Sequence, residues 1–169
     1  GQGVAASAKA FGAQVQLAEL DPARALQAKY DGWPVVYLSE AVKTADVIAT
    51  ATGAYGVVSA AHLENMKDGT FILNVGHVAQ EIDVPYLKQN ASHSEPMPYV
   101  NAYQLGDKTL FLLADGSMFN LTAGYGDSLN AFDVTLAVMA AGIGHIVGEG
   151  ASAEKGLYLL PEHAWMSAL

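Results

Sequence analysis

The chain contains no cysteine, which excludes disulfides, thiol nucleophiles and thiolate metal ligands. Charged residues make up only 15% of it, and basic side chains are scarce, with 8 against 17 acidic ones. The resulting net charge of −9 repels phosphate backbones and anionic lipid, so we expect neither a nucleic-acid nor a membrane partner. Hydrophobic residues account for 51% of the chain, which is typical of a globular α/β protein with buried parallel strands.

Long uninterrupted apolar runs are also missing. The longest apolar stretch, residues 131–148, contains Asp133, His145 and several glycine or polar interruptions. We therefore expect a buried helix there and not a membrane span. The absence of cysteine is compatible with a cytoplasmic enzyme, and we expect that location.

The first 22 residues carry the most informative pattern. A glycine turn, Gly1-Gln2-Gly3, is followed by a helix of small residues, an apolar strand over residues 13–18, and then Glu19. This order predicts the end of a dinucleotide-binding βαβ unit, with pyrophosphate at the helix amino terminus and Glu19 on the adenosine ribose. A carboxylate accepts both ribose hydroxyls and repels a 2′-phosphate, which favours NAD over NADP. The alternative is a solvated glutamate at a strand end.

A complete unit of this kind has a strand and two more glycines before the helix. The sequence begins at Gly1 without an initiator methionine, so we expect that it starts inside the motif and lacks the first strand.

Strands and helices are expected to alternate after this opening. Asp21-Pro22, Ser39 and Ser59 are helix-start signals. The pattern predicts a Rossmann-like, doubly wound parallel sheet, followed by a β-hairpin around residues 106–108 and a long hinge helix. We expect a dinucleotide-binding domain over residues 1–122 and a hinge and C-terminal segment over 123–169. The expected strands are residues 13–18, 34–38, 46–53, 70–76, 100–105 and 109–114, and the polar stretch 89–98 is expected to be mainly a loop.

Four segments resemble the S-adenosylhomocysteine hydrolase family, in the same order and with similar spacing. The first is Glu19-Leu20-Asp21-Pro22 with Ala25-Leu26-Gln27-Ala28, and the second is Thr50-Ala51-Thr52-Gly53. The third and most specific is Asn74-Val75-Gly76-His77 followed by Glu81-Ile82-Asp83. The fourth runs from Leu112-Leu113-Ala114-Asp115-Gly116 to Asn120-Leu121. The resemblance covers nearly the whole chain.

The resemblance implies specific roles at the carboxyl ends of the strands, where ligands bind in such sheets. Glu19 would hold the adenine-side ribose, Asn120 would approach the nicotinamide end, and His77 would face the substrate ribose. At Gly53 and Gly76 the missing Cβ would let backbone amides meet the dinucleotide. The full set of expected NAD-binding residues is Gly1, Glu19, Leu20, Arg24, Thr52, Gly53, Val75, Gly76, His77 and Asn120.

The resemblance also implies an activity. In that family, tightly bound NAD transiently oxidises the 3′-hydroxyl of S-adenosylhomocysteine, the neighbouring 4′ C–H loses its proton, homocysteine leaves, and water adds before the hydride returns. This chain would be the NAD-binding portion, with a nucleoside thioether as substrate and a homotetramer as the assembly. Because the substrate domain is absent, we expect the chain alone to be inactive.

Several positions depart from the family pattern. Ser117 stands where an arginine is usual, and Asp127 replaces a histidine that contacts the substrate sugar. Asp127 could cap the next helix or bind a sugar hydroxyl itself. Arg24 replaces an amide near the cofactor ribose, and its charge would soften the discrimination against a 2′-phosphate. These departures indicate a divergent member, acting on S-adenosylhomocysteine or a related nucleoside or thioether.

Two other functions remain open. The chain could be the cofactor domain of a D-2-hydroxyacid dehydrogenase, or a non-catalytic nucleotide-binding regulatory module. We expect no catalytic metal, since no pair of histidines or acids shows metal-ligand spacing. The remaining histidines are assigned to surface, packing or helix-end positions, and they are His62, His93, His145 and His163.

Overall fold

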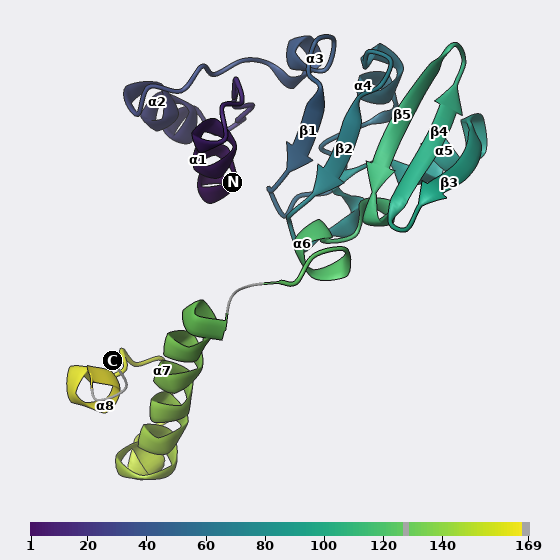
Figure 1. The fold of residues 1–169 in the computed structure, drawn as a ribbon. Coiled ribbons are helices and arrows are strands. Elements are labelled where there is room, and N and C mark those ends of the chain that lie inside the picture. The colour runs from purple at the N-terminus through teal and green to yellow at the C-terminus, as the bar shows by residue number, and fades with distance from the viewer. Residues whose placement is uncertain (127–128, 167–169) are drawn as a thin grey trace. The chain divides into compact units, whose positions relative to one another are not determined.

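The computed structural model describes residues 1–126 and 129–166, and the chain divides into two compact units, Gly1–Gly124 and Tyr125–Leu169 (Figure 1). The boundary falls inside the glycine-containing segment 123–126 for which we predict a hinge. None of the helices in the described ranges is both long enough and apolar enough to cross a membrane.

The first unit is built on a sheet of five strands in the order β1-β2-β5-β4-β3 (Figure 1). The strands β1 (Val47–Thr50), β2 (Phe71–Asn74) and β5 (Lys108–Leu113) are parallel. β4 (Val100–Leu105) pairs with β5 in the predicted antiparallel hairpin, and β3 (Ser92–Met97) pairs with the outer edge of β4. The α/β class, the parallel pairing and the hairpin are thus confirmed.

The prediction of a loop over the polar stretch 89–98 is wrong for most of its length, because residues 92–97 form the edge strand β3. Every residue of β3 is exposed, so the segment has no apolar alternation that would have indicated a strand. Its pairing depends on the free edge of β4 instead. His93 remains exposed, and its Nε2 lies 2.7 Å from the Asn101 Oδ1.

The two strands predicted at residues 13–18 and 34–38 do not form at full length. The structure has one isolated parallel bridge there, between Leu17 and Val35. The Leu17 amide donates to the Pro34 carbonyl and the Val36 amide donates to the Leu17 carbonyl, both at 2.9 Å. In a doubly wound sheet of this kind, the strand that precedes the glycine turn lies between this pair and β1. The described residues contain no such strand, which explains why the bridge does not join the five-stranded sheet.

The helices at the start of the chain form as predicted. α1 (Gln2–Ala10) follows Gly1, and α2 (Pro22–Tyr30) begins with proline in its first turn. The Asp21 side chain caps α2 by accepting the amides of Ala23 at 2.8 Å and Arg24 at 3.2 Å.

Short helices cover the face of the sheet on which Ile48, Ile72 and Leu112 lie side by side. Leu63 and Leu87 pack into the same core and are fully buried. Ser59 is the N-cap of its helix as predicted, whereas Ser39, the other predicted cap, lies inside α3, whose N-cap is Tyr37. The covering elements are α3 (Leu38–Ala41), α4 (Ala60–Asn65), the 3₁₀ turn η1 (Ala79–Glu81) and α5 (Val84–Asn90).

Beyond β5, the 3₁₀ turn η2 (Ala114–Gly116) and α6 (Phe119–Thr122) complete the first unit. The second unit contains α7 (Leu129–Val147), the 3₁₀ turn η3 (Glu149–Ser152) and α8 (Glu162–Met166). The prediction of a buried helix is wrong for α7, because Phe132, Leu136, Met139, Ile143 and Ile146 are exposed. Within its unit α7 packs mainly on η3 and α8, which are too short to cover its apolar surface.

Candidate functional site

The parallel strands β1 and β2 end side by side, and this brings their following loops together. Thr50 is the register partner of Asn74, and the Val75 amide donates to the Thr50 carbonyl at 2.8 Å. Residues 51–53 and 75–77 therefore leave the sheet at the same edge, where a doubly wound fold binds its ligand. Thr52, Gly53, Val75, Gly76 and His77, all predicted site residues, lie in these two loops.

Glu81 binds the first of these loops, and the sequence alone did not predict this role. It is fully buried, and its two carboxylate oxygens receive three donor groups. The Thr52 amide donates at 3.0 Å, the Thr52 hydroxyl at 2.7 Å and the Gly53 amide at 2.7 Å. A carboxylate offers only acceptors, so it matches this set of donors. Glu81 thereby fixes the loop that follows β1.

The two strand-end glycines provide the space for this arrangement. A Cβ on Gly76 would lie 2.0 Å from the Glu81 Oε1, a distance that no real side chain can occupy. A Cβ on Gly53 would lie 3.0 Å from the His77 Cε1, and Gly53 also has a positive φ of 70°. Residue 76 must therefore be glycine because the Glu81 carboxylate lies so close to it. Residue 53 favours glycine because its φ is positive and because the His77 ring lies against it.

The backbone amides of Gly53 and Gly76, at the strand ends where we expect backbone amides to meet the dinucleotide, both have acceptors within the protein. The Gly53 amide donates to Glu81, and the Gly76 amide donates to the Asn74 Oδ1 at 2.7 Å. Both donors are already paired within the protein, because the strand ends are braced by buried polar side chains. A ligand could approach these glycines closely because they have no side chain, but it would not form hydrogen bonds with these two N–H groups.

Asn74 is the second brace, and it too was missed as a structural element of the site. It is fully buried at the end of β2. Its Oδ1 accepts from the Thr50 hydroxyl at 3.1 Å as well as from Gly76, and its Nδ2 donates to the carbonyls of Val78 at 2.9 Å and Gly116 at 3.1 Å. The amide is thus fully satisfied, and it holds three chain segments together.

Asn120 differs from Asn74 because its side-chain oxygen has no hydrogen-bond partner among the described residues. It lies in α6, and the bridge between Met118 and Asn74 places the start of this helix beside the end of β2. The Asn120 Oδ1 is buried and has no hydrogen-bond partner among the described residues. A buried acceptor without a partner is unusual, since most buried polar atoms are paired. This carbonyl oxygen therefore has an unused acceptor position.

His77 is exposed and follows directly after the glycine that ends the β2 loop. Its ring lies over Gly53, the residue that ends the β1 loop. The imidazole thus lies at the two strand ends and is accessible from solvent.

The residues predicted for the ribose end lie at the start of α2. Glu19 is exposed, and its Oε1 accepts the Asp21 amide at 2.9 Å. Leu20 is 98% exposed, and the Arg24 Nε lies 3.9 Å from the Asp21 Oδ2. No hydrogen bond or ion pair between described residues joins this group to the loops at Thr52 and His77. The structure therefore places the predicted residues in two groups.

Gly1 is the N-cap of α1, whose first amides have no partner within the helix. A Cβ on Gly1 would lie 3.9 Å from the Ala51 Cβ, so the start of α1 lies near the loop after β1. This is the position expected for a pyrophosphate site. Asp127 lies outside the described residues.

A separate cavity of about 590 Å³ opens beside β3 and β4, and none of the predicted site residues lines it. Lys88 and Asp115 form an ion pair of 2.8 Å at this cavity. The hydrogen bond to Asp115 raises the pKa of Lys88, and burial raises the pKa of the neighbouring Tyr103.

A parallel α/β sheet whose strand-end loops are braced by buried polar groups, with a helix beginning beside them, is the architecture of a dinucleotide-binding domain. A family model described as "S-adenosyl-L-homocysteine hydrolase, NAD binding domain" matches residues 1–126. The chain belongs to this family, and its cofactor is NAD. The resemblance and the NAD prediction are confirmed, and the family match favours the first of the three functional interpretations.

Curated relatives agree with this assignment. The chain is 38% identical over 163 residues to an adenosylhomocysteinase of Archaeoglobus fulgidus, and 38% identical over 163 residues to one of Saccharolobus solfataricus. It is also 34% identical over 165 residues to an S-inosyl-L-homocysteine hydrolase of Methanopyrus kandleri. These matches cover 96%, 95% and 96% of this chain but 40%, 39% and 39% of the relatives. The chain therefore spans about two fifths of the length of these relatives.

Proposed function

We propose that this chain is the NAD-holding part of an enzyme that reversibly hydrolyses S-adenosyl-L-homocysteine to adenosine and homocysteine. One observation carries the proposal: the family match spans residues 1–126 and includes both strand-end loops and Asn120. When bound, NAD supplies reversible hydride removal from the substrate ribose. The chain itself binds the cofactor, orients it and presents His77 to the substrate.

Glu19 is proposed to accept the two hydroxyls of the adenosine ribose. Its carboxylate is exposed, and the bond from the Asp21 amide occupies Oε1. The second oxygen and the remaining lone pairs stay available to a diol. Arg24, nearby and highly exposed, would partly offset the repulsion of a 2′-phosphate by Glu19.

Asn120 is proposed to accept a hydrogen bond from the nicotinamide carboxamide. The partnerless Oδ1 supports this role, because a carboxamide N–H₂ is the complementary donor and would remove the cost of burying an unpaired acceptor. Glu81 and Asn74 are proposed to keep the floor of this site rigid.

His77 is proposed to face the substrate and to exchange a proton with a ribose hydroxyl oxygen. An imidazole can donate or accept a proton near neutral pH. Its exposure and its position over Gly53 support this role. Asp127 as a sugar contact, the tetrameric assembly and the exact nucleoside of the substrate remain predictions.

Titration calorimetry with NAD and NADP tests the cofactor site. We expect Glu19→Ala to weaken NAD binding by about tenfold or more and to reduce the preference over NADP, since a charge-assisted hydrogen bond contributes roughly 1.5–3 kcal/mol. Glu40→Ala is the control, because that exposed acid pairs only with Lys43 among the described residues. Equal NAD affinities for the wild type and Glu19→Ala would refute the ribose assignment.

The catalytic part of the proposal needs the full-length enzyme. We expect His77→Ala to leave NAD affinity within about threefold, while turnover falls by roughly 10²–10⁴, the usual range for a lost general acid or base. Wild-type full-length protein that binds NAD but shows no hydrolysis would favour a regulatory module instead.

A further inference from the structure

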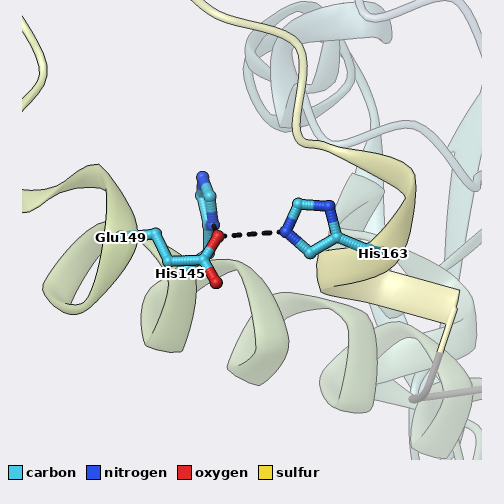
Figure 2. A group of neighbouring side chains, drawn as sticks. All are labelled: His145, Glu149 and His163. Atoms are coloured by element: carbon cyan, nitrogen blue, oxygen red, sulfur yellow. Dashed lines mark hydrogen bonds and ion pairs between the residues drawn. The ribbon is translucent and has the colours of Figure 1, made fainter.

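A group of metal-binding side chains lies in the second unit, far along the chain from the strand-end loops. His145 lies in the last turn of α7, Glu149 opens η3, and His163 lies in α8 (Figure 2). The Glu149 Oε2 is 3.4 Å from the His145 Nδ1 and 3.0 Å from the His163 Nε2. Figure 2 shows the carboxylate between the two imidazole rings. The centroids of the two rings are 6.0 Å apart, and the ring planes are nearly perpendicular.

These distances suit a single metal ion. Zinc bonds to imidazole nitrogen and carboxylate oxygen at about 2.0–2.2 Å, so neighbouring ligands of a tetrahedral site lie roughly 3.3–3.5 Å apart. The Glu149–His145 separation of 3.4 Å lies in this range and the Glu149–His163 separation of 3.0 Å is slightly shorter, and the three candidate ligand atoms all lie within 4.8 Å of one another.

The surroundings leave room for an ion and for a fourth ligand. Small residues line the cavity of about 350 Å³ at this position, namely Ala141, Gly144, Gly148 and Ala164. A Cβ on Gly144 would meet no atom within 4 Å, which confirms that the helix surface is open there. The side chains of Glu149 and His163 are 71% and 67% exposed, so water can complete the coordination.

We propose that His145, Glu149 and His163 bind a divalent transition-metal ion, with zinc as the best match, and that this ion fastens α8 to the end of α7. Two imidazoles and one carboxylate are the ligand types of zinc sites, whereas magnesium and calcium prefer sets made only of oxygen. Without an ion, the polar part of this contact consists of the His145–Glu149 and Glu149–His163 pairs, and the largely exposed Glu149–His163 pair is of a kind that usually contributes under about 1 kcal/mol. With an ion, residues 18 positions apart in the sequence share one coordination sphere.

The site does not depend on the proposed function, because all three ligands lie in the second unit and none belongs to the NAD site. Its role would be structural. It would hold the short helix α8, which has only five residues, against a helix of 19.

The test uses the whole 169-residue chain, untagged, with cobalt(II) as a spectroscopic probe and zinc in titration calorimetry. We expect one equivalent of zinc to bind, and cobalt to give visible absorption bands of a low-coordinate nitrogen and oxygen site. His163→Ala should lower the zinc affinity by at least about tenfold, because even partners that only support a ligand contribute 10–100-fold. Glu149→Gln should have the same direction of effect.

His93→Ala serves as the matched control, since it removes another exposed histidine from the chain and should leave zinc binding unchanged. Circular dichroism of each variant, at the protein concentration used in the zinc titration, checks that the helices persist. The proposal is overturned if the wild type binds no stoichiometric zinc, or if His163→Ala and Glu149→Gln bind it as tightly as the wild type does.

Discussion

The Glu81 Oε1 accepts the Gly53 amide at 2.7 Å, across 28 positions in the sequence. The same carboxylate takes the amide and hydroxyl of Thr52, so one buried acid organises the backbone at the end of β1. The conformation of the loop at Thr52 and Gly53 therefore depends on a buried residue 28 and 29 positions further along the chain.

Replacing this acid by its amide tests that dependence. In Glu81→Gln, one acceptor oxygen becomes an N–H₂ donor that faces backbone and hydroxyl donors, so at least one buried bond is lost. We expect the free energy of unfolding to fall by roughly 1–3 kcal/mol, measured by urea denaturation. Glu40→Gln, which changes an exposed acid, should stay within about 0.5 kcal/mol of the wild type. Equal losses in the two variants would contradict the bracing role.

The close approach of Gly76 to Glu81 makes a second prediction. Gly76→Ala would place a Cβ 2.0 Å from the Glu81 Oε1, and the carboxylate could yield only by breaking its bonds to the β1 loop. We expect a loss of at least about 2 kcal/mol and a large loss of NAD affinity. Gly53→Ala should cost less, roughly 1–2 kcal/mol, because its strain is a positive φ and its contact is with an exposed ring. The reverse order of stability, measured by thermal and urea unfolding, would disprove this account.

The sequence predicted the parts of this fold that depend on local pattern. Apolar runs that end at glycine located β1 and β2, and the Asp21-Pro22 pair located the start of α2. The loops that carry Thr52 and His77 followed from those strand ends, because parallel strands end at one edge.

The parts that sequence could not predict depend on contacts between distant segments. Glu81 belongs to the most specific family motif, but the sequence does not show that it is buried, because its burial depends on donors 28 and 29 positions away. The edge strand β3 is entirely exposed and so has no hydrophobic signal. The proximity of His145 and His163 depends on how α8 packs back on α7, which no ligand-spacing pattern records.

The free energy of unfolding is expected to fall at alkaline pH because of two titratable residues at the cavity beside β4, Tyr103 and Lys88. Burial raises the pKa of Tyr103, and the bond to Asp115 raises that of Lys88, so both groups hold their protons longer in the folded state. Their contribution is fully present below the unfolded pKa values, about 10, and is lost as the pH rises through the higher folded values. Lys88 is half exposed, so its contribution to the free energy of unfolding is small.

Urea unfolding between about pH 8 and 11 measures this effect. The free energy of unfolding should decline above about pH 10, and Tyr103→Phe should make that decline shallower because one linked proton is removed. Tyr37→Phe, a change at an 80% exposed tyrosine, should leave the slope unaltered. Identical slopes for the wild type and Tyr103→Phe would show that Tyr103 does not contribute.

Substitutions at the buried Asn74 and the partly buried Asn120 are expected to distinguish a role in stability from a role in binding. Asn74 makes four hydrogen bonds at the end of β2, whereas the Oδ1 of Asn120 has no partner within the described chain. Asn74→Leu should cost roughly 3 kcal/mol or more, since it leaves several buried groups unpaired. Asn120→Leu removes an unsatisfied acceptor and should change the free energy of unfolding by less than about 1 kcal/mol. It should nevertheless weaken NAD binding by roughly tenfold in titration calorimetry, because a ligand donor would lose its acceptor. An Asn120→Leu protein that binds NAD as the wild type does would mean that this oxygen faces no part of the cofactor.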